Sequence, residues 1–246
     1  MENTKWKTLY RAGAVAPPIA LVLYSSQFIL LIFGDPFPIT IEGWFALFQR
    51  NKLLGLWYLN ALDIVSFALL GIMFLALYVA LRRVRPAWTL IALYFALLGV
   101  VVFIVPRVLT LSVVTFSDLH AAATTEAQRT MYLTAGETLS QVSTATPQTL
   151  GFLFMAVAGL IVSTVVLRSG SFGRSVALSK EVGYVGIVGF AVALANYTSW
   201  IIAPSIAAML MPINGLLWLV WWLMMSVGLF RLARDTPVHG ADSTVG

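Results

Sequence analysis

Long apolar stretches, separated by short polar segments, run through the whole chain. A helix that crosses the hydrocarbon core of a bilayer needs roughly 20 predominantly apolar residues. Six stretches meet this requirement: residues 12–33, 53–81, 87–105 (extensible to 116), 147–167, 182–203 and 213–232. The pattern therefore predicts an all-α protein. We expect a polytopic bundle of six transmembrane helices that forms a single integral membrane domain over residues 1–246.

Two connecting segments carry helical patterns of their own. Residues 34–52 contain EGWFALF, whose aromatic side chains are typical of an interfacial helix. In residues 117–146, Thr125 and Gln128 have the spacing of a capping box, which starts a helix. The face of that helix predicted to be apolar comprises Met131, Ala135, Leu139 and Val142. We expect an extracellular amphipathic helix in this third loop, as a simple cap on the bundle or, alternatively, as a lid over a pocket.

Composition agrees with a lipid environment and indicates an orientation. Hydrophobic residues make up 60% of the chain and charged residues only 10%, against about 25% charged in soluble domains. Most of the 15 Lys and Arg residues lie in every second connecting segment along the chain: the N-terminal tail, residues 82–85, residues 168–180 and residues 231–234. Basic residues collect on the cytoplasmic side, so we expect a cell-membrane protein with both termini in the cytoplasm. The net charge of +5 has the same origin, and we expect no nucleic-acid partner.

Several chemistries are excluded by the residue inventory. The chain has no cysteine, which rules out disulfides, thiol catalysis and thiolate metal sites. Its two histidines, His120 and His239, are too few for a histidine-cluster metalloenzyme. Asp118 and His120 stand close in sequence, but the acidic residues around them lack strict ligand spacing. We therefore expect no metal site and no cofactor.

Asp63 is the leading candidate for a functional residue, because a carboxylate inside an apolar span is costly unless it is paired, hydrated or neutral. Asn60 and Ser66 lie three residues to either side of it, on roughly the same helix face. Arg107, near the outer end of the third span, is the expected partner. Three interpretations stay open: a structural Asp63–Arg107 pair, an ion- or proton-coupled site, and hydration from the outer surface.

Other polar residues within the spans are neutral. Gln27 in the first span, and Asn196 with Tyr197 in the fifth, suit interhelical hydrogen bonds or, alternatively, ligand contacts. Small residues also recur every four positions, as in Ala12, Ala16 and Ala20. This spacing lets helix backbones approach closely, within one chain or across a homo-oligomer interface. Membrane lipids and a hydrophobic small molecule are the other expected partners.

Three segments together resemble an uncharacterised prokaryotic family of six-helix integral membrane proteins, known only as a domain of unknown function. They are the Ala-rich AAATTEAQRTMYLTAGE segment, a basic R-S-x-x-F-G-R turn and a Trp-rich last span that ends in L-x-R-L. The turn comprises Arg168, Ser169, Phe172, Gly173 and Arg174, and the tail comprises Leu229, Arg231 and Leu232. The resemblance implies a fold and a location. It carries no activity and no site residues.

The sequence thus supports three hypotheses about function. The first is a non-enzymatic multi-pass membrane protein that binds a lipid, a hydrophobic ligand or a membrane partner in its bundle. The second is a small ion- or proton-coupled transporter that uses Asp63. The third is a membrane enzyme with an outward-facing site.

Overall fold

The computed structural model describes residues 5–34, 36–144, 146–168 and 180–234. The basic turn after Arg168, with Ser169, Phe172, Gly173 and Arg174, lies outside these residues, as do both chain ends. Every regular element in the described residues is an α-helix, as predicted from the apolar pattern. The helices are α2 (Lys7–Phe33), α3 (Ile41–Arg50), α4 (Lys52–Tyr58), α5 (Leu62–Leu81), α6 (Pro86–Thr110), α7 (Ser112–Ala122), α8 (Glu126–Thr144), α9 (Thr146–Arg168), α10 (Lys180–Ile202) and α11 (Pro204–Arg234).

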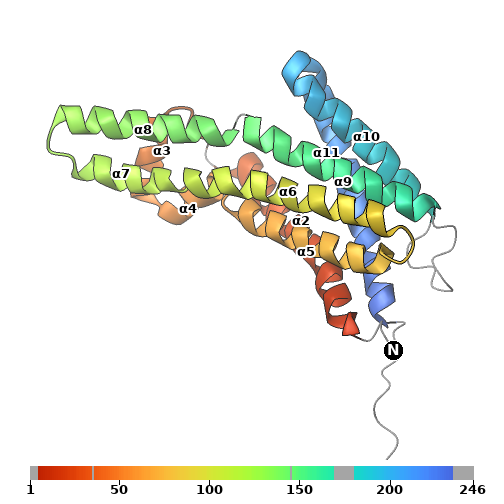
Figure 1. Ribbon diagram of the computed structural model, residues 1–246. Helices are drawn as coiled ribbons and strands as arrows, with labels where there is room; N and C mark the ends of the chain where they lie inside the picture. Colours follow the sequence, from red (N-terminus) through yellow and green to blue (C-terminus); the bar gives the residue numbers. More distant parts are fainter. Residues whose placement is uncertain (1–4, 35, 145, 169–179, 235–246) are drawn as a thin grey trace, which may run out of the picture.

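Six long helices pack in a closed ring (Figure 1). Following contacts around the bundle, α2 packs on α5, α5 on α6, α6 on α9, α9 on α10, α10 on α11, and α11 returns to α2. The ring is filled by large side chains, among them Phe67 and Phe103, whose rings stack with centroids 3.6 Å apart. The first and last long helices are therefore direct neighbours, although they lie at opposite ends of the sequence.

Among the described residues, five helical segments are long and apolar enough to cross a membrane: α5, α6 together with α7, α9, α10 and α11. They coincide with five of the six predicted spans. The first predicted span, residues 12–33, corresponds to α2, a helix of 27 residues that completes the ring. The last span begins earlier than predicted, at Pro204 rather than at residue 213, because proline is well tolerated in the first turn of a helix.

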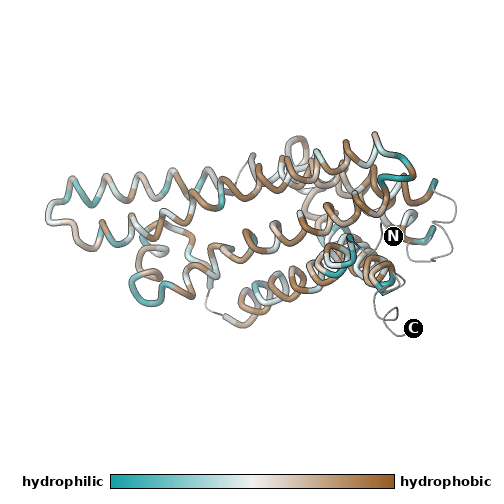
Figure 2. Tube along the Cα trace, turned by 60° about the horizontal axis from the view of Figure 1, so that its bottom comes forward, coloured by the Kyte–Doolittle hydropathy of each residue, from teal (hydrophilic) through white to brown (hydrophobic). Residues whose placement is uncertain are grey.

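The third span and the loop after it differ from the prediction. Residues 117–122 are helical rather than loop, and α6 and α7 form one nearly continuous rod, Pro86–Ala122. Helix α8 returns antiparallel beside α7, and the pair projects beyond the rest of the bundle, with α3 and α4 beside it (Figure 1). Figure 2 shows that this projecting hairpin is markedly more hydrophilic than the bundle. The expected helix after Thr125 is present, and the Thr125 hydroxyl accepts the Gln128 backbone N–H at 3.3 Å.

The apolar face predicted for α8 is only partly correct. Leu139 packs against a second hydrophobic cluster formed by Ile41, Phe45, Phe48 and Val113, and Ala135 is half-buried. Met131 is instead 55% exposed, and the side chain of Val142 lies outside the described residues. The helical segment predicted within residues 34–52 is α3, capped by the Thr40 side chain, and it contributes most of this second cluster.

The second span is not the continuous helix predicted over residues 53–81. It breaks between Tyr58 and Leu62, where Asn60 has a positive φ of 58°. The Asn60 N–H donates to the Trp57 carbonyl, and the Ala61 N–H donates to the Leu56 carbonyl. This is the Schellman arrangement, in which a left-handed residue ends a helix and satisfies its last carbonyls. Asn is one of the few residues other than Gly that adopts this conformation readily.

Candidate functional site

The break before α5 places Asp63 in the first turn of the next helix, where it is only 5% exposed. The Gln27 side-chain amide on α2 donates to Asp63 Oδ1 at 3.0 Å. On the other side, Arg107 Nη2 on α6 lies 3.7 Å from Asp63 Oδ2. The three side chains come from three neighbouring helices of the ring, so the expected pair of Asp63 and Arg107 is present and Gln27 extends it.

Local structure explains why this point of the bundle tolerates a buried carboxylate. The N-terminus of a helix carries a partial positive charge and free backbone N–H groups, which favour an anionic side chain in the first turn. Arg107 is only 6% exposed. Its guanidinium also lies over the Phe103 ring, 5.3 Å from the ring centroid. Arg107 is thus held by a charge on one side and a π face on the other.

Two polar atoms beside the pair have no hydrogen-bond partner in the described part of the chain: Arg107 Nε and the Tyr24 hydroxyl. Tyr24 lies on α2 three residues before Gln27, on the same side of the helix. Buried donors of this kind are usually satisfied. Sequence reasoning missed Tyr24, because a tyrosine in an apolar span is ordinary; its spacing from Gln27 was the signal available.

Asn60 and Ser66, predicted to share a face with Asp63, do not contact its carboxylate in the described structure. Asn60 instead forms the helix break, and its carbonyl accepts the Asp63 backbone N–H at 3.0 Å. The Ser66 hydroxyl donates to the Leu62 carbonyl of its own helix at 3.1 Å. The break rotates Asn60 out of the helical register on which the shared face depended.

Asn196 and Tyr197 lie on α10, and both are buried. The Tyr197 hydroxyl accepts the side-chain amide of Asn214 on α11 at 3.1 Å, which makes the interhelical hydrogen bond that one interpretation expected. The Asn196 side-chain oxygen has no partner among the described residues. Asn214 was not singled out from the sequence, although it is a buried polar residue in the last span.

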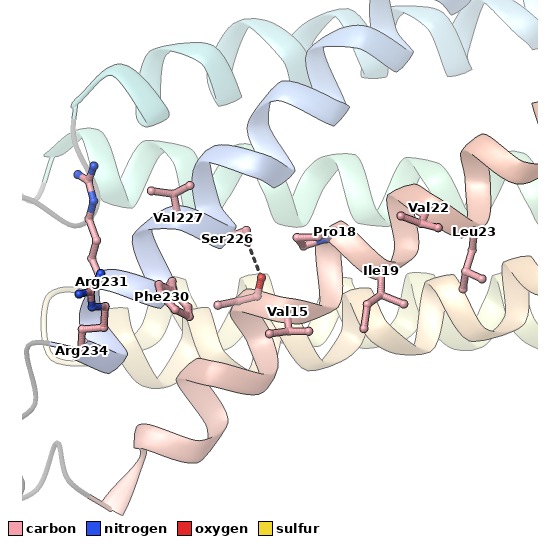
Figure 3. A pocket seen from close by; sticks show the side chains of 11 residues that line it. Val15, Pro18, Ile19, Val22, Leu23, Ser226, Val227, Phe230, Arg231 and Arg234 are labelled. Carbon is pink, nitrogen blue, oxygen red and sulfur yellow. Dashed lines mark hydrogen bonds between the residues drawn. The ribbon is translucent and has the colours of Figure 1, made fainter.

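A separate groove of about 640 Å³ opens on the outer surface of the ring, between α2 and α11. Its α2 wall is apolar, and α11 adds Ser226, Val227 and Phe230. Arg231 and Arg234 line one end, as Figure 3 shows. The residues of the α2 wall are Ala14, Val15, Pro18, Ile19, Val22 and Leu23.

One hydrogen bond ties the two walls of the groove together. The Ser226 hydroxyl on α11 donates to the Ala14 backbone carbonyl on α2 (Figure 3). In an α-helix the Ala14 carbonyl would accept the N–H of residue 18, but that residue is Pro18 and has no N–H. Ser226 therefore supplies, from the neighbouring helix, the donor that the proline removes.

The described part of the projecting hairpin contains exposed charges but no cluster of metal-ligating side chains. Lys52 Nζ lies 2.7 Å from Asp118 Oδ2, and the Gln49 amide bridges Ser117 and Asp118. His120 packs against the Phe45 ring. Within the described ranges, no three His, Cys, Asp or Glu side chains come close enough to hold a metal ion.

A family model described as a domain of unknown function (DUF4386) matches residues 47–226, which is most of the chain. The chain belongs to the DUF4386 family. No curated protein and no solved structure gives a match. The resemblance read from the sequence is therefore confirmed at the level of the family.

The family match covers most of the buried polar cluster of this DUF4386 protein but little of its groove. Asp63, Arg107 and the Asn196–Tyr197 pair lie inside the matched residues, whereas Gln27 does not. Most of the groove lies outside them, because α2 precedes residue 47 and the two arginines follow residue 226. Chemically, the buried cluster can hold or exchange a charge, and the groove can accept an elongated apolar group beside a positive charge.

Proposed function

We propose that this protein is a non-enzymatic, multi-pass protein of the cell membrane that binds a lipid chain in the groove between α2 and α11. The observation that carries the proposal is the groove itself, about 640 Å³ in volume and walled mainly by aliphatic side chains of two helices. Isolated apolar side chains on a lipid-facing surface need no explanation, but a concave apolar site is the usual form of a ligand pocket.

The proposed topology has six spans, with α2 as the first and both termini in the cytoplasm. It is supported by the basic residues at one end of the ring, where Arg82, directly after α5, lies over the ring of Trp6, directly before α2. The α7–α8 hairpin then projects into the extracellular space. The absence of cysteine makes this testable by adding single cysteines in exposed turns, Thr124→Cys and Val84→Cys. A membrane-impermeant maleimide should label position 124 in intact cells and position 84 only after permeabilisation.

The binding proposal is tested by filling the groove. Val15 and Ile19 are 48% and 44% exposed on its α2 wall, and Val15→Trp with Ile19→Trp would occupy it. Val101 and Val105 on α6 are a matched control, because they have the same spacing and are 55% and 52% exposed. Native mass spectrometry of detergent-purified protein counts the lipids retained. The wild type and the α6 variant should retain one lipid that the groove-filled variant loses; equal retention in all three would refute the proposal.

A second candidate function rests on the buried charges. Asp63 and Arg107 are paired at 3.7 Å, next to a broken helix and beside donors that have no partner among the described residues. Ionisable groups inside the membrane beside interrupted helices are typical of transport sites. We propose ion- or proton-coupled transport through Asp63 as the alternative. In proteoliposomes, Asp63→Asn should abolish a proton-driven flux while the bundle remains folded; a flux unchanged by this substitution would exclude Asp63 as the coupling residue.

A further inference from the structure

The two arginines at one end of the groove point to the kind of lipid that it holds. We infer that the groove is a site for one anionic phospholipid of the cytoplasmic leaflet, with an acyl chain against α2 and α11 and a phosphate headgroup at Arg231 and Arg234. This inference rests on the proposed binding of a lipid in the groove, and it adds the leaflet, the headgroup charge and the residues that recognise it.

The length of the groove fits one leaflet. The lining residues run from Ala14 to Leu23 on α2 and from Ser226 to Arg234 on α11. At a rise of about 1.5 Å per residue, these stretches give roughly 12–14 Å along each wall. One leaflet accounts for about half of a hydrocarbon core some 30 Å thick. An acyl chain in the groove therefore places its headgroup at the level of the arginine end.

The arginines are available for an anion. Arg231 and Arg234 are both exposed, and among the described residues neither forms an ion pair or a hydrogen bond. Arg11 lies one helical turn before Val15 on the same face of α2, so it adds a third positive charge at this end. Arginine is well suited to this role, because its planar guanidinium binds phosphate oxygens through two parallel hydrogen bonds.

Charge and shape together select an anionic amphiphile rather than a neutral one. A zwitterionic lipid would bring its own cation to the cluster and offset the attraction of its phosphate. A basic side chain near an anionic membrane surface contributes roughly fivefold in affinity. Two arginines in direct contact should therefore favour an anionic over a zwitterionic lipid by about tenfold or more.

The test compares headgroups at constant chain length. Wild-type protein is reconstituted in nanodiscs of dioleoyl phosphatidylglycerol and dioleoyl phosphatidylcholine in equal amounts, released, and analysed for retained lipid by native mass spectrometry. Phosphatidylglycerol should exceed phosphatidylcholine at the single retained site by about tenfold. In Arg231→Gln with Arg234→Gln the ratio should fall close to one, while one lipid is still retained. Arg231→Lys with Arg234→Lys should keep part of the preference.

The control variant removes two positive charges at the same end of the ring but leaves the groove unchanged. Arg83 and Arg85 lie in the turn between α5 and α6 at the same end of the ring, and changing both to Gln should leave the lipid ratio unchanged. If the wild type shows no headgroup preference, or this control loses it equally, the arginine site is wrong. If the glutamine variant does not fold, the two single substitutions replace it, and each should lower the ratio by about fivefold.

The outcomes also separate this inference from the proposed function beneath it. Loss of the preference with retention of one lipid supports both. Retention of one lipid without a preference in the wild type overturns only the headgroup assignment. A groove-filled variant that retains its lipid overturns lipid binding in the groove. A dimer that dissociates when the groove is filled, with no lipid lost, would show that a second copy of the chain occupies it.

Discussion

Ser226 donates a hydrogen bond to the Ala14 carbonyl, across the contact between the last and the first long helix of the ring. The bond compensates for Pro18, which cannot donate to that carbonyl. Ser226 and Ala14 both have little exposed surface, so water does not readily replace the hydrogen bond between them. It closes the ring at the point where the groove begins, and it joins residues that are far apart in the chain.

The first prediction is that Ser226→Ala destabilises the bundle mainly through this carbonyl. A buried acceptor left without a donor costs about 1–3 kcal/mol in unfolding free energy. Pro18→Ala restores an N–H to α2, so in that background the cost of Ser226→Ala should fall to a few tenths of a kcal/mol. A double-mutant cycle by unfolding in mixed micelles measures the coupling, expected at about 1–2.5 kcal/mol.

Ser66→Ala is the matched control, because Ser66 is also buried and donates to the carbonyl of Leu62 in an uninterrupted part of α5. That carbonyl retains the backbone donor of its own helix, so the loss should be at most about 0.5 kcal/mol. Equal losses for the two serines, or additive effects of Ser226→Ala and Pro18→Ala, would contradict the assigned role of Ser226.

The sequence predicts the features of this fold that depend on local composition. Apolar length identified the long helices, and the cost of a charge in lipid identified Asp63 and its partner Arg107. The sequence does not reveal that Ser226 satisfies Ala14, because that contact depends on how the ring closes. It also does not reveal the groove, whose walls are ordinary aliphatic residues until α2 and α11 are placed side by side.

The break at Asn60 shows why the boundaries of the second span were predicted wrongly. Residues 53–81 are predominantly apolar and contain no proline, so hydropathy alone indicates one helix. The left-handed conformation at a single Asn ends α4, and the chain then starts α5 within the same apolar stretch. An Asn inside an apolar run is compatible with a helix, so the local sequence does not distinguish the two structures.

The second prediction follows from that backbone conformation. Asn60→Gly should leave stability unchanged or raise it slightly, since Gly adopts a positive φ without a steric cost. Asn60→Val should lower the unfolding free energy by about 1–2 kcal/mol, because a β-branched residue is strained there. Unfolding measurements on both variants test the break directly. If Gly proves as damaging as Val, the Asn60 side chain rather than its φ angle is what matters.

The third prediction concerns Asp63 and Arg107. Either Asp63→Asn or Arg107→Gln leaves the remaining group without its charge partner in a buried site, and losses of about 3–5 kcal/mol are typical. The double change to Leu at both positions should recover much of that loss, because it removes both desolvation costs. Thermal stability in detergent and unfolding in mixed micelles measure the series.

A different result would shift the interpretation of the pair. If Asp63→Asn is as stable as the wild type or more so, the carboxylate does not serve folding, and the transport alternative gains support. Gln27→Ala gives a second measure, because it removes the amide bonded to Asp63 Oδ1 without leaving a charge unpaired. Its expected cost is about 1.5–3 kcal/mol, the usual range for a hydrogen bond to a charged group.

The fourth prediction concerns the close contact of α6 and α9. A Cβ on Gly99 would lie 2.8 Å from the Gly151 carbonyl oxygen and 2.7 Å from Met155 Cγ. Gly99→Ala therefore forces the two helices apart and should cost about 1–3 kcal/mol. Gly215 on α11 is the control, since a Cβ there meets nothing within 4 Å. Gly215→Ala should be neutral or slightly stabilising; a comparable loss there would mean that glycine acts by something other than close packing.

The fifth prediction contrasts the buried pair with an exposed one. Lys52 and Asp118 join α4 to α7 at 2.7 Å, a shorter distance than that between Asp63 and Arg107, but their side chains are 52% and 46% exposed. Water and salt screen such a pair, and exposed ion pairs contribute about 0–1 kcal/mol. Lys52→Gln and Asp118→Asn should each change the unfolding free energy by less than about 1 kcal/mol, and less still in high salt. Losses as large as those at Asp63 would mean that the projecting hairpin, not the ring, limits the stability of the protein.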